Sequence, residues 1–300
     1  IVGTLELTNK SKYGLTSRGI PIYLFTPYNK CYPHFIVGCS EKDVSKNRIA
    51  LIKFDDWTAQ STFPRGLLQQ TLGVSGDFEA EKQALIWQAC PWKWPKGPYV
   101  PQSKEKPNRK ELVGYTFNID PEGCKDIDDV LTFRHLDTGE WEITITISDV
   151  ATYVEDGGHV DIFASLIGQT LYDNDGQVMR PMLPQEYSEQ TCSLLPDKFS
   201  YGISLKFVWN GKEITNKEWF ESVFMNNKSY TYEEFQNMDT HYKEPLKQVT
   251  SYLAKEEVTD SHKWIEQMMI LYNTEAGKLL KEAGMGVLRK HSEPDLEKLE

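Results

Sequence analysis

Alternating hydrophobic and polar residues in the second half of the chain predict a β-sheet. Residues 115–119 alternate like a strand, and 130–134 continue the pattern after an acidic stretch. The turn Asp137-Thr-Gly139 then predicts a hairpin into 140–148. That last run places apolar side chains on one face and hydroxyls on the other, namely Trp141, Ile143, Ile145 and Ile147 against Thr144, Thr146 and Ser148. A further strand is expected at 203–209, ended by an Asn210-Gly211 turn.

The N-terminal part of the chain reads as short strands separated by turn residues. The β-rich runs are 2–7, 20–25, 34–38 and 48–54, and a short element is expected between Phe63 and Gly73. A closed β-barrel of the OB type is the economical arrangement, because closure removes exposed strand edges. Such barrels bind single-stranded nucleic acid through aromatic and basic side chains, here Tyr13, Tyr23, Phe25, Tyr28, Tyr32 and Phe35 with Lys10, Lys12, Arg18 and Lys30. We expect at least half of these aromatics to fill the barrel core instead.

Helical spacing of apolar residues predicts three helices. Two cover residues 77–87 and 161–171. The third is longer: Asp260 or Ser261 can cap its beginning, and Gly284 can end it. The apolar stripe of this helix is expected to pack in a core.

A proline- and tryptophan-rich stretch separates the two patterns. Residues 90–107 contain five prolines close to three tryptophans, which favours an ordered, extended strap over a flexible tether. We therefore expect an α+β protein. An OB-type barrel with a trailing helix would occupy residues 1–88, a linker 89–107, and a mixed α+β domain 108–300.

Charge is distributed unevenly between these parts. The first 106 residues hold 14 Lys and Arg against 9 Asp and Glu, giving +5. The remainder holds 19 basic and 35 acidic residues, giving −16, so the two parts add up to the net charge of −11. The basic part suits contact with a phosphate backbone, whereas the acidic part can approach a polyanion only with cations or local basic patches. For most individual residues, plain solvated surface charge is an adequate explanation.

Composition and cysteine usage indicate a globular intracellular protein. The five cysteines are scattered and odd in number, which suits reduced thiols better than a disulfide framework. A zinc site at Cys31, His34 and Cys39 would lack a fourth ligand. No run is long and apolar enough to span a membrane, so no membrane partner is expected, and the absence of an initiator Met suggests part of a longer protein. The expected location is the cytoplasm, with the nucleus or an organelle left open.

The densest chemistry of the chain is a cluster of four aspartates between two predicted strands. Asp120, Asp126, Asp128 and Asp129 lie in one short stretch with apolar flanks. Carboxylates this close raise one another's pKa and need a cation near a core. Ligand sets made only of oxygen point to magnesium or manganese. If 126–129 continues as a strand, Asp126 and Asp128 share one face while the turn at Pro121 brings Asp120 back beside them.

A solvated acidic turn and a calcium loop are the alternatives to such a metal site. An EF-hand counted from Asp120 would need Gly and Glu where the chain has Lys125 and Leu131. The apolar flanks disfavour an exposed turn. Carboxylates gathered around one or two divalent ions are typical of phosphoryl chemistry.

The residues resemble the RNase II, RNase R and exosome-catalytic-subunit family of 3′→5′ exoribonucleases, which share the RNB domain. The family pattern Ile-Asp-Pro followed by Asp-x-Asp-Asp matches residues 119–129 without a gap. Further similar segments run over nearly the whole chain, namely Phe63–Gly66, Leu72–Asp77, Ile147–Val154, Pro181–Pro184, Cys192–Leu194, Lys228–Glu233, His262–Asn273 and Leu288–His291.

This resemblance implies a cold-shock-like OB barrel followed by the N-terminal part of an RNB catalytic domain. It implies that the four aspartates bind Mg²⁺, or Mn²⁺ in its place, and that Asp128 and Asp129 are the strongest candidates for catalysis. The reaction would be two-metal-ion hydrolysis of single-stranded RNA to nucleoside 5′-monophosphates. Tyr172 and Tyr232 match family tyrosines that contact the 3′-terminal nucleotides, as stacking on bases would allow. RNA-decay proteins are the implied partners.

Several positions depart from the family pattern. Thr146 stands where many members have His, and Ile167 where Arg is usual. The stretch 238–260 is too short for the strands that the family has there, and the second half of the catalytic domain, with its arginines, does not occur before Glu300. An RNA-binding or scaffolding protein that no longer cleaves is therefore the main alternative. A phosphatase or DNA nuclease of another fold would leave the long resemblance to chance.

Overall fold

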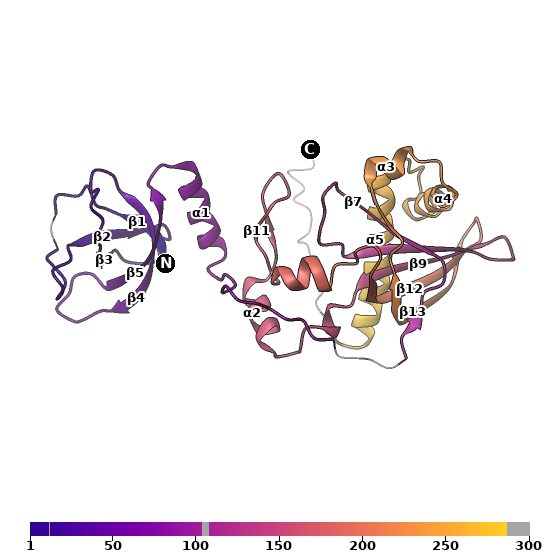
Figure 1. Ribbon diagram of the computed structural model, residues 1–300, viewed down its shortest axis with the longest axis horizontal. Coiled ribbons are helices and arrows are strands. Elements are labelled where there is room, and N and C mark those ends of the chain that lie inside the picture. Colours follow the sequence, from indigo (N-terminus) through magenta and orange to yellow (C-terminus); the bar gives the residue numbers. More distant parts are fainter. Residues whose placement is uncertain (12, 104–107, 287–300) are drawn as a thin grey trace, which may run out of the picture. The chain divides into compact units, whose positions relative to one another are not determined.

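The computed structural model describes residues 1–11, 13–103 and 108–286, which form two compact units (Figure 1). Residues 1–97 and 159–184 make up the first unit, and residues 98–158 together with those from 185 onward make up the second. The segment 159–184 therefore interrupts the second unit in sequence and packs with the first. The expected domain boundaries at residues 88 and 107 stay a prediction.

The first unit contains the predicted closed barrel. Its strands follow the spatial order β1-β2-β3-β5-β4, with β3 and β5 parallel and the other pairs antiparallel. Phe25 and Phe35 are buried in the barrel core, so these two predicted RNA-binding aromatics are core residues. The element after Phe63 was expected to be short and is a strand of 10 residues. The bounds are β1 Val2–Leu5, β2 Ile22–Pro27, β3 Phe35–Gly38, β4 Arg48–Asp56 and β5 Arg65–Val74.

Helix α1 (Phe78–Ala89) closes one side of the barrel. The Asp77 carboxylate caps it by accepting a hydrogen bond of 3.0 Å from the Ala80 backbone N–H. Ala80 and Ala84 pack against the barrel residues Ile49 and Leu51. The helix approaches so closely that a Cβ atom on Gly73 would lie 2.7 Å from the Ala80 Cβ, which explains the small residues on both sides.

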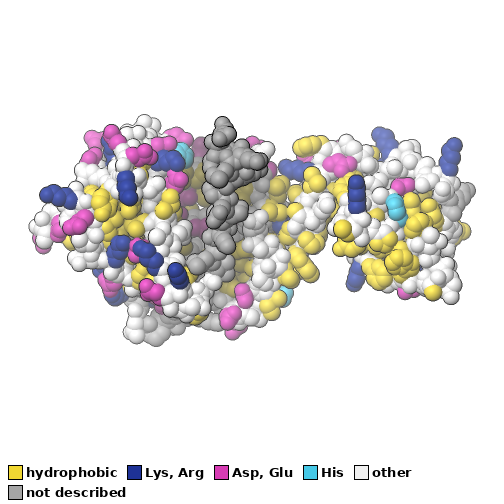
Figure 2. Space-filling view, turned by 180° about the vertical axis from the view of Figure 1, so that it is seen from behind, with side chains coloured by type: hydrophobic (Ala, Val, Ile, Leu, Met, Phe, Trp, Pro, Cys, Tyr) yellow, Lys and Arg dark blue, Asp and Glu magenta, His cyan; other side chains and the backbone are white. Residues whose placement is uncertain are grey.

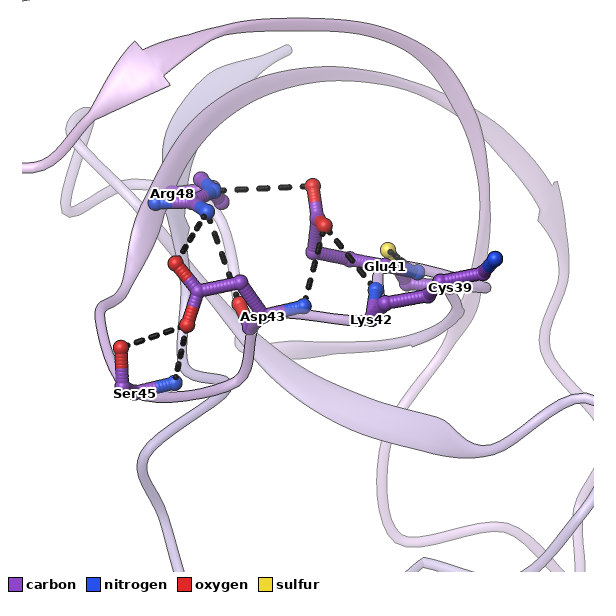
Figure 3. Close-up of polar contacts among 6 residues, drawn as sticks. All are labelled: Cys39, Glu41, Lys42, Asp43, Ser45 and Arg48. Atoms are coloured by element: carbon purple, nitrogen blue, oxygen red, sulfur yellow. Dashed lines mark hydrogen bonds and ion pairs between the residues drawn. The ribbon is translucent and has the colours of Figure 1, made fainter.

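A partly buried arginine, Arg48, binds the loop between β3 and β4 (Figure 3). The Arg48 guanidinium lies 3.6 Å from a Glu41 carboxylate oxygen and 3.2 Å from one of Asp43. Asp43 in turn accepts hydrogen bonds from the backbone N–H and the hydroxyl of Ser45. The carboxylates thus bind both the arginine side chain and the backbone of the loop.

The segment 159–184 contributes one helix and one hairpin to the first unit. Helix α2 (His159–Ile167) is shorter than the predicted helix at 161–171, because Gly168 takes φ = 82° and ends it. Leu171 instead begins strand β10 (Leu171–Tyr172), which pairs with β11 (Val178–Arg180).

The second unit is a mixed sheet of seven strands in the order β14-β7-β8-β9-β12-β13-β6. The edge strands β14 and β6 are parallel to their neighbours, and the inner strands are antiparallel. The predicted hairpins at 137–139 and 210–211 join β8 to β9 and β12 to β13. The bounds are β6 Lys110–Glu111, β7 Tyr115–Asp120, β8 Asp129–His135, β9 Trp141–Ser148, β12 Phe199–Trp209, β13 Ile214–Met225 and β14 Lys228–Thr231.

Three helices pack against one face of this sheet (Figure 1). They are α3 (Tyr232–Asn237), α4 (Lys243–Ala254) and α5 (Ser261–Glu282). As predicted, Asp260 caps α5, and Gly284 takes the left-handed conformation just after it. The core between sheet and helices contains the stacked rings of Phe117, Phe133 and Phe235 together with Leu246 and Trp264. Two short helical turns complete the unit, η1 (Val150–Thr152) and η2 (Glu186–Thr191).

The hydroxyl-bearing face of β9 is buried as well. Thr146 is 0% exposed and its hydroxyl lies 2.7 Å from that of Ser204, which donates to Ser222 at 2.8 Å. Thr116 and Thr132 form a similar pair at 2.8 Å. The hydroxyls satisfy one another, so this polar row can be buried in the protein.

Acidic and basic side chains intermingle on the face of the second unit shown in Figure 2. Glu142 lies 2.8 Å from Arg134 and 3.6 Å from Lys206, and Lys206 is also 2.9 Å from Glu218. The acidic excess of this half of the chain is therefore partly paired locally. Among the described helices, none combines the length and the apolar character needed to cross a bilayer.

The packing of α4 can be tested at Leu246, which is 0% exposed in the core. We expect Leu246→Ala to lower the free energy of unfolding by about 2–5 kcal/mol, because it leaves a cavity under the helix. The neighbouring Lys247→Ala, which removes only the surface ion pair with Glu257, should cost less than about 1 kcal/mol. Urea unfolding of both variants measures this, and equal losses would show that α4 is not packed as described.

Candidate functional site

The ends of two neighbouring strands position the aspartate cluster. Asp120 is the last residue of β7, where it lies opposite Thr231 of the parallel strand β14. Asp129 is the first residue of β8 and lies opposite Ile147 of β9. The prediction that Asp126 and Asp128 lie in a strand was wrong, because residues 121–128 form a loop and the strand begins at Asp129.

This aspartate loop, residues 121–128, is held by one serine and one leucine from a distant segment. The Ser193 hydroxyl donates to the Lys125 carbonyl at 2.7 Å and accepts from the Ile127 N–H at 3.0 Å. The Leu194 N–H then donates to the Ile127 carbonyl at 2.9 Å. Ile127 is 3% exposed and packs with Leu194, so the loop is anchored between Asp126 and Asp128.

A buried amide orients Asp120. The Asn118 Nδ2 donates to an Asp120 carboxylate oxygen at 2.8 Å. The Asn118 Oδ1 accepts from Asn226 Nδ2 at 2.8 Å and from the Ser229 hydroxyl at 2.7 Å. Because both ends of the 1% exposed amide are bonded, Asn118 has one orientation, and it directs an N–H at the carboxylate.

Burial and repulsion by neighbouring carboxylates raise the pKa values of Asp120, Asp128 and Asp129. Burial, followed by the charges of Asp120 and Asp128, raises the pKa of Asp129 to about 7. Asp128 lies at the exposed rim, yet the protein atoms around its carboxyl, followed by the charges of Asp126 and Asp120, raise its pKa to about 6. The pKa of Asp120 is also raised, first by burial. All four carboxylates therefore interact electrostatically.

The donor set of the cluster suits a divalent cation. Carboxylate oxygens are the ligands that Mg²⁺ prefers, and a bound cation would relieve the repulsion that raises the pKa values. In the part of the chain that the structure describes, no group of three or more His, Cys, Asp or Glu side chains is already arranged to hold a metal ion. The match between the aspartate cluster and a divalent cation therefore rests on the carboxylate donors and on their electrostatic interaction. Magnesium or manganese at this cluster stays a prediction.

Tyr232 lies beside the aspartates. It begins helix α3 directly after β14, and burial together with the charges of Asp120 and Asp129 raises its pKa to about 12. Its ring is stacked on His262 of α5, with ring centroids 3.9 Å apart and planes 9° from parallel. The phenol is therefore neutral and its ring is held in place. Tyr172 lies in the first unit on β10 and is 47% exposed.

Sequence reasoning missed the residues that support the site. Asn118 and His262 lie in or beside segments that resemble the family, and Ser193 is the middle residue of the Cys-Ser-Leu match, so the sequence marks their positions without giving them a role. Lys198 carries no such signal, and its ammonium binds the Gln190, Thr191 and Ser193 carbonyls at 2.5, 3.0 and 2.7 Å. The predicted similarity at 288–291 lies outside the described residues.

The departures from the family pattern also have structural counterparts. Thr146 is bonded to Ser204 inside the sheet, and Ile167 is a buried residue at the end of α2. The stretch 238–260 contains helix α4, which contributes Leu246 and Val249 to the core.

Family comparisons confirm the predicted resemblance. Residues 109–248 match the RNB domain, and residues 22–89 match the Dis3-like cold-shock domain 2 (CSD2). The human exosome complex exonuclease RRP44 is 29% identical over 226 residues, covering 71% of this chain and 23% of that protein. The Xenopus tropicalis DIS3-like exonuclease 2 is 27% identical over 246 residues, covering 75% and 28%. The chain thus spans about a quarter of the length of these relatives.

Solved structures show the same fold. The apo form of Mycoplasma genitalium RNase R superposes with a TM-score of 0.75 at 18% identity, over 100% of this chain and 54% of that one. Yeast Ssd1, a pseudonuclease, superposes with a TM-score of 0.57 at 19% identity, over 85% and 34%. The fold is therefore shared by a nuclease and by a protein described as a pseudonuclease.

The raised pKa of Asp129 predicts how stability depends on pH without divalent cations. In the folded protein the Asp129 carboxyl keeps its proton up to about pH 7, while in the unfolded chain it loses the proton near the ordinary value of 3.8. The protonated carboxyl therefore makes its full contribution to the free energy of unfolding below about pH 4, and this contribution is lost as the pH rises to about 7. We expect Asp129→Asn to be more stable than the wild type by roughly 1–3 kcal/mol at about pH 8, and the difference to vanish near pH 4.

Urea unfolding in a chelator at both pH values measures this difference. Asp137→Asn, in the exposed turn between β8 and β9, is the matched control and should follow the wild type. If the wild type and Asp129→Asn showed the same pH dependence, Asp129 would not carry a raised pKa.

Proposed function

We propose that this chain, which carries the RNB domain and a second cold-shock domain of the RNase II and RNase R family, acts in hydrolysis of single-stranded RNA from its 3′ end to nucleoside 5′-monophosphates. One observation carries the proposal: four electrostatically coupled aspartates lie at the facing ends of β7 and β8 and in the loop between them, inside the region that matches the RNB domain. The exonuclease names of RRP44 and DIS3-like exonuclease 2 support it.

In this proposal Asp120, Asp126, Asp128 and Asp129 hold two magnesium ions, or manganese in their place. When bound, such ions would stabilise charge on the phosphodiester and lower the pKa of the attacking water. Asp128 is the exposed member of the cluster and so the one that a substrate can reach directly. Asn118 keeps the Asp120 carboxylate in one orientation, as supporting residues around metal ligands do.

The two tyrosines would hold the RNA end. Tyr232 is neutral at the pH of the cell, so its ring can stack on a base and its hydroxyl can donate a hydrogen bond. Tyr172 offers a ring that is 47% exposed on a hairpin of the first unit. Stacking contributes roughly 1–3 kcal/mol per base without reading the sequence, which suits a general exonuclease.

The second candidate function is RNA binding or scaffolding without cleavage. The similarity of the fold to yeast Ssd1, a pseudonuclease, favours it. Retention of all four aspartates favours cleavage, since a binding protein has no need to keep clustered carboxylates that repel one another. RNA-decay proteins are proposed as partners because RRP44 is named as an exosome complex exonuclease, and an intracellular location, in the cytoplasm first, accords with this.

The proposal is tested by cleavage of single-stranded RNA. At its natural length and with magnesium, the protein should release nucleoside monophosphates from the 3′ end of a 5′-labelled oligonucleotide. Asp128→Asn should reduce the rate at least about 100-fold with little change in RNA affinity, since one charged ligand is lost. The Asp137→Asn control should be fully active. Equal rates in the wild type and Asp128→Asn would remove Asp128 from catalysis, and RNA binding without any cleavage would favour the scaffold.

Metal binding is tested separately from activity. In excess MgCl₂ at about pH 8, the melting temperature of the 300-residue chain should rise relative to KCl of equal ionic strength, because the ion binds only the folded state. Asp129→Asn should lose most of this rise, and Asp137→Asn should keep it. If the wild type showed no response to MgCl₂ or MnCl₂, the cluster would not be a metal site.

A further inference from the structure

The hairpin that carries Tyr172 is attached to the helix of the barrel, through contacts that all lie within the first unit. The Arg180 guanidinium lies over the ring of Trp87 in α1, 4.5 Å from its centroid. One helical turn earlier, the Lys82 ammonium lies 3.6 Å from a carboxylate oxygen of Asp173. Both partners of α1 belong to the β10–β11 hairpin or its turn, so one helix holds the hairpin at two points.

Both attachments involve a neighbour of Tyr172: one is made by the next residue in the chain, and the other by the strand partner of the residue before it. Asp173 follows Tyr172 in the chain, and its other carboxylate oxygen closes the turn by accepting the Asp175 and Gln177 N–H groups at 3.0 and 2.8 Å. Across the hairpin, Arg180 pairs with Leu171, the residue before Tyr172. A change at either cation would therefore reach the Tyr172 backbone through one neighbour.

The strap after α1 holds the base of the same segment. The Trp94 indole N–H donates to the carbonyl of Met182, two residues after the end of β11, at 3.0 Å. The Trp94 ring also lies 4.5 Å from that of Phe163 in α2. The helix and the strap of the barrel together fix the hairpin from its turn to its base.

Burying the Arg180 side chain at this position costs free energy. The residue is 3% exposed, its Nε has no hydrogen-bond partner, and burial lowers the pKa of its guanidinium. Among the described residues, we find no carboxylate paired with it. An apolar side chain would avoid the cost of burying the charge, so stability alone does not account for the arginine. Its flat guanidinium can, however, stack on Trp87 in one orientation and so fix the strand.

We infer that Lys82 and Arg180 are positioning residues for RNA binding, which fix the Tyr172 hairpin on α1 so that the barrel domain sets the position of the ring that receives the RNA end. The inference rests on the proposed function, because it assigns Tyr172 an RNA contact. Neither cation contacts RNA itself. Both act through the backbone on either side of Tyr172.

The structural part is tested without RNA, by hydrogen–deuterium exchange of the 300-residue chain. Lys82→Ala and Arg180→Met should each speed exchange in residues 171–180 and leave the seven-stranded sheet unchanged. Lys82→Arg, which keeps the charge, should restore slow exchange. Lys46→Ala is the matched control, because Lys46 is an exposed lysine of the same unit that forms no ion pair with a described residue. Unchanged exchange in both variants would overturn the inference.

The functional part is tested by kinetics on a single-stranded oligoadenylate with the protein at its natural length. Lys82→Ala should raise KM about 2- to 5-fold and Arg180→Met about 10-fold, with kcat within about twofold of the wild type. In a Tyr172→Ala background, the same changes should have no further effect on KM, because the ring that they position is gone. Additive effects would overturn the inference.

Salt dependence separates positioning from direct contact with phosphate. A cation that neutralises one phosphate of single-stranded RNA contributes about 0.7 to the slope of log affinity against log salt. Lys82→Ala and Arg180→Met should leave this slope unchanged, and a reduced slope would mean direct contact and overturn the positioning role. If the wild type bound RNA but did not cleave it, the proposed function would fail, while exchange and salt-dependent affinity would still decide the inference.

Discussion

Mutual repulsion among four clustered carboxylates is the constraint that the surrounding part of the second unit has to accommodate. Asp120, Asp128 and Asp129 all have raised pKa values, because nearby protein atoms limit their hydration and because two strand ends and the loop between them place the carboxylates near one another. A fold gains nothing in stability from this arrangement without a cation. The surrounding residues nevertheless hold it firmly, with Asn118 bonded to Asp120 and Ser193 bonded on both sides of Asp126. Such rigid support for an unfavourable cluster is typical of a site kept for chemistry.

The residues proposed to act on RNA are distributed over both units. The second unit holds the acidic cluster and Tyr232, whose ring is fixed by stacking on His262. The first unit holds Tyr172 on a hairpin that belongs in sequence to the RNB domain but packs on the helix of the barrel. The barrel and its helix thus support a segment that belongs in sequence to the RNB domain.

Local patterns were sufficient to predict much of the fold. Alternation in β9, the 137–139 turn and the Asp260 cap of α5 depend on neighbouring residues, and all three were predicted. Errors arose where one residue redirects the chain. Gly168 ends α2 early, and the aspartate loop remains irregular until Asp129. Helix α4 was not predicted, because its place in the core depends on the sheet beneath it.

The candidate site likewise has a part that the sequence predicted and a part that it did not. Its aspartates were visible as a motif, since they lie close together in sequence. Their support was not, because Ser193 bonds Ile127 across 66 positions and Ser229 bonds Asn118 across 111. Contacts of this kind depend on the fold and leave no local pattern. The role of Lys198, which binds three carbonyls beside the loop, is of the same type.

Binding of divalent cations by the aspartate cluster is tested most directly by anomalous scattering from a crystal of the 300-residue chain soaked in MnCl₂. We expect an anomalous peak about 2.0–2.3 Å from carboxylate oxygens of at least two of Asp120, Asp126, Asp128 and Asp129. If the four aspartates were well ordered in such a crystal and no anomalous peak lay near their carboxylates, the cluster would not be a divalent-cation site.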